Sequence, residues 1–234
     1  DIKVVDIGDI PGDAGRLADH YAKAEAAVRK GLAAGAMRGS FGGDHGIPIP
    51  IFRALDGQGP ITLVHVDAHL DWHHDVNGVT EGYSSTIRRA SEMAHVDRIF
   101  QFGVRGSGSA RPGEVKDALA YGATIVTHAE WEDVGTKALL ERIPDGGRYY
   151  ITIDADAFDP AVMPAVALPQ PGGVTYREAI DLIKGLSRKG HIVGMDFVEL
   201  TPAADLNEIS SITAGHIILN LIGACVRSGQ FGRK

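Results

Sequence analysis

The sequence is nearly free of cysteine, because Cys225 is the only one among its 234 residues. One cysteine cannot form a disulfide within the chain, and it cannot supply the several thiolates of a structural zinc site. Cys225 stands in an apolar C-terminal segment, so we expect a small, buried apolar side chain. Any metal site in this chain therefore uses ligands other than thiolates.

Targeting signals and single-sign charge blocks are also missing. No signal-peptide pattern occurs, and no uninterrupted apolar run has the length of a membrane span, so we expect a cytoplasmic protein without a membrane partner. The net charge is −7, and no block of lysines and arginines indicates a nucleic-acid surface. We therefore expect a small-molecule partner and no nucleic acid.

The composition, with 44% hydrophobic and 23% charged residues, is typical of a globular protein. We expect residues 1–234 to form a single domain. The chain begins without a methionine, inside a predicted strand, so we also expect that an N-terminal portion is missing.

Predicted strands and helices alternate along the chain. Short β-branched runs predict strands, and apolar residues at spacings of three and four predict helices. Thr175 and Glu178 form a capping box, and residues 70–85 are expected to be a loop. The strands are expected at 2–7, 37–41, 61–66, 98–104, 123–127, 149–153 and 191–198, and the helices at 17–32, 85–93, 114–121, 136–142, 176–186 and 209–226. This alternation predicts an α/β fold with a mostly parallel central sheet and helices on both faces.

Four predicted strands are followed by acidic or imidazole side chains. Alternate residues of an extended chain point the same way, so Asp67, His69 and Asp71 share one side. On its own, this cluster is equally compatible with a solvated strand end. However, similar groups follow three other strands, and ligands of parallel sheets bind beyond the carboxyl ends of the strands. The complete set is His45, Asp67, His69, Asp71, Asp154, Asp156 and Glu199.

The four aspartates of this set would repel one another strongly without a cation, so the sequence predicts a dinuclear divalent metal site. Carboxylate and imidazole ligands without sulfur favour manganese, although cobalt, nickel and zinc also bind such ligands. Two ions about 3.5–4 Å apart can share a bridging hydroxide that is nucleophilic near neutral pH. The predicted chemistry is metal-assisted hydrolysis.

Three motifs carry a family resemblance. Residues 42–45 (GGDH), 67–71 (DAHLD) and 152–156 (TIDAD), with Asp159-Pro160 after the third, resemble the signature motifs of the ureohydrolase (arginase and agmatinase) family. The motifs occur in the family's order, and the similarity runs from residue 4 to the final helix. The resemblance implies a three-layer α/β/α sandwich, and it implies a homotrimer or homohexamer.

The resemblance also implies a role for each residue at the site. One Mn²⁺ would be bound by His45, Asp67, Asp71 and Asp154, and the second by Asp67, His69, Asp154 and Asp156, with Asp67 and Asp154 bridging. Glu199 falls where the family places the carboxylate that pairs with the substrate guanidinium, an arrangement that suits two parallel hydrogen bonds. Asp71, Glu81 and Glu199 are the predicted catalytic residues.

Glu81 marks one departure from the family pattern. It stands where family enzymes commonly carry a proton-shuttling histidine. Glu81 could relay protons or bind a cationic group of the substrate. His73 and His74 are alternative sources of an imidazole, although a pair of solvated loop histidines is the simpler interpretation.

The surrounding loops depart from the family as well. Residues 164–169 lack the usual glycines, and residues 106–109 lack the acid that arginases use for the α-amino group, so arginine is a poor candidate substrate. Trp72 and His74 are predicted to bind substrate, and Tyr83 could line the same pocket; for Trp72 and Tyr83, simple packing under the loop is an equal alternative. Arg88, Arg89 and Arg105 could bind a carboxylate of a guanidino acid or pair with nearby acids.

Three functions remain open at this stage. The first is manganese-dependent hydrolysis of a linear guanidino compound, agmatine-like or a guanidino acid, to urea and an amine. The second is hydrolysis of a different C–N group, such as a formimino compound. The third is a catalytically silent metal-binding homologue.

Overall fold

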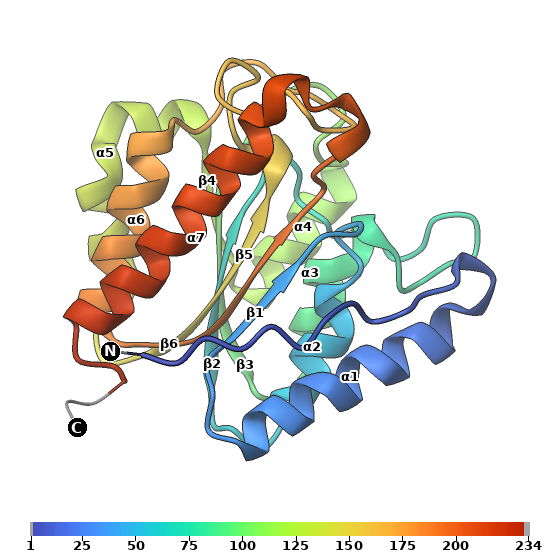
Figure 1. The fold of residues 1–234 in the computed structure, drawn as a ribbon. Helices are drawn as coiled ribbons and strands as arrows, with labels where there is room; N and C mark the ends of the chain where they lie inside the picture. The colour runs from blue at the N-terminus through green and yellow to red at the C-terminus, as the bar shows by residue number, and fades with distance from the viewer. Residues whose placement is uncertain (1, 232–234) are drawn as a thin grey trace.

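The computed structural model describes residues 2–231, which form one parallel sheet between two layers of helices (Figure 1). The six strands lie in the order β1-β6-β5-β2-β3-β4, and all neighbouring strands are parallel. They are β1 (Arg38–Phe41), β2 (Ile61–Val66), β3 (Val96–Val104), β4 (Thr124–Thr127), β5 (Arg148–Asp154) and β6 (His191–Val198). The prediction of an α/β fold with a parallel sheet is confirmed.

Each face of the sheet is covered by its own group of helices. One face packs against α1 (Leu17–Ala33), α2 (Pro48–Ala54), α3 (Thr86–Ser91) and α4 (Pro112–Tyr121). The other packs against α5 (His128–Arg142), α6 (Tyr176–Lys189) and α7 (Ile209–Arg227). All six residues of β2 are buried, as expected of a strand covered on both faces. The molecule is therefore a three-layer α/β/α sandwich.

The predicted strand at 2–7 is wrong. Within the described residues this segment is not part of the sheet, and Val4, Val5 and Ile7 are 70%, 64% and 74% exposed. A β-branched run favours an extended conformation, but a strand also needs a neighbour for its hydrogen bonds. The edge strand β1 pairs with β6 and not with this segment.

Two helices differ from their prediction for local reasons. The sequence analysis missed α2, because Pro48 and Pro50 suggest a loop; Pro48 instead occupies the first turn, where a missing N–H costs nothing. Helix α5 begins at His128, well before the predicted start, with Thr127 as its N-cap. Gly135, at φ 77°, kinks α5, so the predicted 136–142 segment is its second half. The capping box of α6 at Thr175 is confirmed.

The C-terminal helix α7 is long and apolar. An 18-residue window within Leu206–Arg227 has a mean hydropathy of 1.7, so by length and composition alone this helix is apolar enough to cross a membrane, and the expectation that the chain contains no such apolar stretch is corrected. One face of this helix joins the core through Ala214, Ile217 and Leu221, while Leu219 is 64% exposed. Cys225 is buried, as predicted. Packing against the core accounts for the apolar composition of the buried face.

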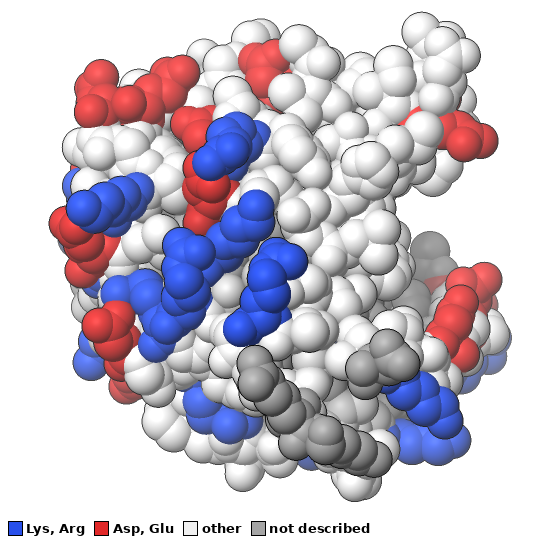
Figure 2. All heavy atoms as spheres, turned by 60° about the vertical axis from the view of Figure 1, so that its left-hand side comes forward, with Lys and Arg blue, Asp and Glu red and all other residues white. Residues whose placement is uncertain are grey.

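Figure 2 shows the face on the side of α5, α6 and α7, where a group of Lys and Arg side chains is bordered by Asp and Glu. Ion pairs also form within these helices: in α5 Arg142 lies 2.7 Å from Glu130, and in α6 Arg177 lies 2.7 Å from Asp181. The surface charge is therefore mixed in sign.

The connections between strands create one preferred position for a ligand. After β2 the chain continues to β3 on one side, and after β5 it continues to β6 on the other, although β2 and β5 are neighbours. Ligands of parallel α/β sheets bind at such a reversal, beyond the carboxyl ends of the strands. The aspartate motifs that follow β2 and β5 meet at this point.

Candidate metal centre

All six predicted metal ligands converge at the carboxyl edge of the sheet. They come from the loop after β1 and from the ends of β2 and β5, and five are buried while His69 is half-buried. His45 forms the centre of one group. Its Nδ1 lies 3.0 Å from Oδ2 of both Asp67 and Asp154, and 3.4 Å from Oδ2 of Asp71.

His69 forms the centre of a second group. Its Nδ1 lies 3.0 Å from Oδ2 of Asp156 and 3.4 Å from Oδ1 of Asp67. The two oxygens of Asp67 thus face different histidines, which is the arrangement of a bridging carboxylate. Oδ1 of Asp154 accepts a hydrogen bond from the Asp156 backbone N–H at 2.7 Å.

A polar pair in the sheet fixes the tautomer of His45. Thr152 donates its hydroxyl proton to Oδ1 of Asp196 at 2.6 Å, so the Thr152 oxygen accepts from Nε2 of His45 at 2.9 Å. Nε2 therefore carries a proton, and Nδ1, which faces the aspartates, is the nitrogen that would bind a metal. Burial raises the pKa of Asp196 to about 6, so it is still ionised at neutral pH. Sequence analysis missed Asp196; its signal was an acid inside an apolar strand.

The electrostatics of the site call for cations. Burial, and next the charge of Asp67, raise the pKa values of Asp71 and Asp154 well above the usual range. Oδ2 of Asp71 is buried and has no hydrogen-bond partner among the described residues. Hydrogen bonds to Asp156 and Asp67 raise the pKa of His69 to about 11. Buried carboxylate oxygens and imidazole nitrogens of this kind fit divalent metal ions well.

Two site residues have strained backbones. Asp71 and Glu199 adopt φ values of 54° and 61°, which are uncommon outside glycine and cluster at functional sites. The carbonyl of Asp71 accepts from the N–H groups of Ile87 and Arg88 at the start of α3. Oε1 of Glu199 accepts from the His45 N–H at 2.8 Å, and burial raises the pKa of Glu199. Glu199 therefore lies beside the first group of ligands.

Glu81 is partly exposed and has partners of its own. Its carboxylate pairs with Arg53, and its backbone carbonyl accepts from the hydroxyl of Tyr21 at 3.0 Å. His73 lies 3.2 Å from Glu114. The structure thus gives Glu81 a guanidinium partner from this chain, and its predicted catalytic role stays a prediction.

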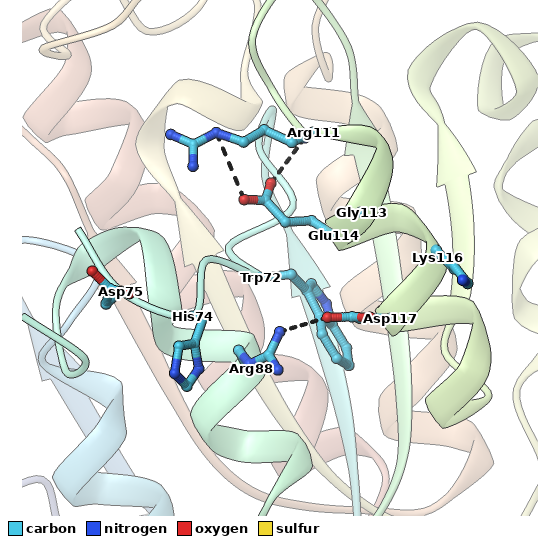
Figure 3. A pocket seen from close by; sticks show the side chains of 9 residues that line it. All are labelled: Trp72, His74, Asp75, Arg88, Arg111, Gly113, Glu114, Lys116 and Asp117. Atoms are coloured by element: carbon cyan, nitrogen blue, oxygen red, sulfur yellow. Dashed lines mark hydrogen bonds and ion pairs between the residues drawn. The ribbon is translucent and has the colours of Figure 1, made fainter. Parts of the chain in front are cut away.

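Trp72 and His74 line a cavity of about 550 Å³ between the loop and helices α3 and α4 (Figure 3). Its walls contain none of the six predicted metal ligands. Trp72 is only 2% exposed, and its indole N–H donates to Gln101 at 2.7 Å. Tyr83 is 51% exposed. This cavity is separate from the metal centre. The substrate contacts predicted for Trp72 and His74 therefore stay predictions.

Arg105 does not reach toward a substrate. All three of its guanidinium nitrogens donate to backbone carbonyls, including those of Asp156 at 2.9 Å, Ala157 at 2.9 Å and Pro171 at 3.1 Å. Arg105 thereby ties the turn that carries Asp156 to the 170–171 loop. Arg88 pairs with Asp117. Arg89 pairs with Glu92. Pairing with nearby acids therefore holds for Arg88 and Arg89, whereas Arg105 bonds to backbone carbonyls instead.

A parallel α/β/α sandwich with two histidine groups that share Asp67 at its carboxyl edge is the framework of a metal-dependent hydrolase. The chain belongs to the arginase family, whose model matches residues 1–223, and it is an agmatinase-like ureohydrolase. The family assignment made from the three motifs is confirmed, and the family implies a dinuclear metal site.

Individual relatives agree with this assignment. The chain is 34% identical to guanidinopropionase of Pseudomonas aeruginosa, over 94% of this chain and 71% of that protein. It is 31% identical to N(1)-aminopropylagmatine ureohydrolase of Thermus thermophilus, over 92% and 71%. Among solved structures, proclavaminate amidino hydrolase from Streptomyces clavuligerus superposes with a TM-score of 0.87 at 28% identity, covering 96% of this chain and 76% of that one.

Proposed function

We propose that this protein hydrolyses a linear guanidino compound, agmatine-like or a guanidino acid, to urea and an amine, with two Mn²⁺ ions as its native cofactor. The single observation that carries the proposal is the division of Asp67 between the two histidine groups. Two bound ions would supply Lewis acidity and lower the pKa of a water molecule.

The ligand residues would hold the ions in two sets. His45 and Asp71 would bind one ion, His69 and Asp156 the other, and Asp67 would serve both, together with Asp154. His45 would use Nδ1, whose lone pair is exposed by the hydrogen bond from Nε2 to Thr152. Because each of these side chains is anchored by the sheet, the ions would be held at a fixed position beyond β2 and β5.

Glu199 would orient the substrate. Its Oε1 is occupied by the N–H of His45, and among the described residues Oε2 has no hydrogen-bond partner, so Oε2 could accept from a guanidinium N–H. A planar guanidinium has several parallel N–H groups, and a charge-assisted bond to one of them would fix its angle. The guanidinium carbon would then face the ligands rather than solvent.

The substrate preference follows from what surrounds the site. Residues 106–109 carry no acid for an α-amino group, and Arg105 is occupied by backbone carbonyls. Arginine is therefore a poor candidate, and compounds without an α-amino group are better ones. The relatives named as guanidinopropionase and aminopropylagmatine ureohydrolase support a guanidino substrate in general.

A urea-release assay tests this function. The Mn²⁺-loaded protein would be given agmatine, 3-guanidinopropionate, 4-guanidinobutyrate and arginine, with Asp67→Asn as the inactive variant and Asp133→Asn, the same change on an exposed position of α5, as the matched control. Urea from one or more of the first three compounds supports the proposal. Ammonia or formamide from a formimino compound would support the second function, and full metal occupancy without turnover would support the silent homologue.

Assembly and location complete the proposal. The family resemblance suggests a homotrimer or homohexamer, and the sequence pattern suggests a cytoplasmic location. Native mass spectrometry would test the first point, since a monomeric mass would contradict it.

A further inference from the structure

Four buried side chains form a continuous hydrogen-bonded chain behind the metal centre. Nε1 of Trp72 lies 2.7 Å from Oε1 of Gln101, Nε2 of Gln101 lies 2.9 Å from Nδ1 of His65, and Nε2 of His65 lies 2.8 Å from Oδ2 of Asp67. Their exposed fractions are 2%, 0%, 0% and 1% in that order. Neither His65 nor Gln101 was singled out by the sequence.

The direction of this chain is fixed at its Trp72 end. An indole N–H can only donate, so the oxygen of the Gln101 amide must face it. The nitrogen of the same amide faces the carbonyl of Leu70 at 2.8 Å, and a carbonyl can only accept. These two contacts independently give the same orientation of Gln101.

The orientation of Gln101 determines the tautomer of His65. The amide nitrogen donates one proton to Leu70 and the other to Nδ1 of His65, so Nδ1 carries a lone pair. A neutral imidazole then has its proton on Nε2, and this N–H donates to Oδ2 of Asp67. Although His65 lies among the ligand group with His45, Asp67 and Asp71, neither of its nitrogens has a lone pair free for a metal.

We propose that His65 is a positioning residue for the bridging carboxylate of Asp67, and that Trp72 and Gln101 set the His65 tautomer that this requires. Ligating carboxylates depend on outer hydrogen bonds for their orientation. The Nε2–H of His65 holds Oδ2 on the side of His45, which leaves Oδ1 directed toward His69. The role of Trp72 is then to hold this chain rather than to contact substrate.

The chain offers a matched control for Trp72. Trp131 is also fully buried, and its indole N–H also donates, to Thr136 at 2.9 Å. It packs in the core on the α5 side of the sheet, whereas Trp72 packs on the opposite side. Replacing either tryptophan by phenylalanine removes one N–H from a buried ring, but only Trp72→Phe breaks the chain to Asp67.

The first test measures the tautomer of His65. Nitrogen-15 spectra of histidine-labelled full-length protein, loaded with diamagnetic Zn²⁺, distinguish a protonated from an unprotonated ring nitrogen. We expect His65 to carry its proton on Nε2 in the wild type and in Trp131→Phe, to populate the other tautomer in Gln101→Met, and to do so to a smaller extent in Trp72→Phe, where the Leu70 carbonyl still orients the Gln101 amide. A proton on Nδ1 in the wild type, or Zn²⁺ bound to Nε2, would overturn the proposal.

The second test measures Mn²⁺ affinity by titration calorimetry. His65→Phe should weaken binding about 10- to 100-fold, as is typical for loss of an outer-shell partner. Gln101→Met, which removes both amide protons, should weaken it in the same direction, and Trp131→Phe should leave it unchanged. Wild-type affinity in either His65→Phe or Gln101→Met refutes the positioning role.

The proposal rests on the metal centre of the proposed function, but the two fail differently. A wild-type protein that binds no Mn²⁺ contradicts that function, while the His65 tautomer still decides this inference. If His65→Phe does not fold, as judged by thermal unfolding, Gln101→Met provides the affinity measurement.

Discussion

Residues 67–72 and residues 73–83 are adjacent in sequence, yet the fold holds them in opposite ways. In the first segment nearly every side chain is buried, and the carboxylate of Asp67 contacts three histidines. In the second, His74 and Tyr83 are exposed and Glu81 pairs with Arg53 at the surface of the loop. The difference separates two expected tasks: the buried segment would hold the metals, and the exposed one would select the substrate.

Replacing a buried carboxylate of this segment by a neutral amide should have the largest effect on metal binding and activity. Asp67→Asn should abolish binding of both ions and reduce urea release to background, because Asp67 faces both ligand groups. Metal analysis of the purified variant, beside Asp133→Asn, measures this. Two retained ions would show that Asp67 does not bridge and that metal binding depends less on residues 67–72 than we expect.

Changing Glu199 tests the substrate side of the buried centre. Glu199→Gln keeps the size of the side chain but replaces a charged acceptor by a neutral one, so a guanidinium loses a charge-assisted bond worth about 1.5–3 kcal/mol. We expect kcat/KM to fall about 10- to 100-fold with both metals retained. An unchanged kcat/KM for every guanidino substrate would show that Glu199 does not bind the guanidinium.

Acidification should weaken metal binding at the buried segment. In the metal-free site the pKa of His69 is about 11, so this imidazole is protonated at neutral pH and must lose its proton when a metal binds. Affinity should therefore rise with pH, by about tenfold per pH unit for one displaced proton. Calorimetric titrations at pH 6, 7 and 8 would show it; affinity independent of pH would mean that no proton is displaced.

The smallest effect is expected in the exposed segment. Glu81→Gln removes the charge that pairs with Arg53, so we expect a modest fall in turnover with metal content intact. Steady-state rates across pH, compared with Arg53→Met, distinguish the possible roles. A pH-rate profile identical to that of the wild type would show that Glu81 relays no proton.

The ligand set could be predicted from sequence because strand ends have a strong local signal. An apolar run such as Ile61–Val66 predicts a buried strand, and alternation then places Asp67, His69 and Asp71 on one side. The same logic failed at residues 2–7, because a β-branched run does not reveal whether a neighbouring strand is present. Helix α2 was missed because proline usually ends a helix, and the sequence does not show that Pro48 lies in the first turn, where proline is tolerated.

The supporting residues could not be predicted for a different reason. Gln101 and Asp196 are polar side chains inside apolar strands, and their partners come from other strands at long sequence separations. Periodicity identifies the faces of one element, but it contains no information on which residues of two elements meet. Trp72 was predicted to bind substrate from its position next to Asp71. That position does not show that its ring is buried in the core.

The pairing of β2 with β5 also determines when the metal centre can exist during synthesis. Ala68 and Asp156 are in hydrogen-bond contact although 88 positions separate them, and β3 and β4 with their helices lie between. A ribosome therefore releases His45, Asp67, His69 and Asp71 well before Asp154 and Asp156 emerge. Because these contacts form late, we expect the ions to bind a finished sheet rather than to nucleate its folding. A truncated chain that ends before β5 would retain four of the six predicted ligands and lose Asp154 and Asp156.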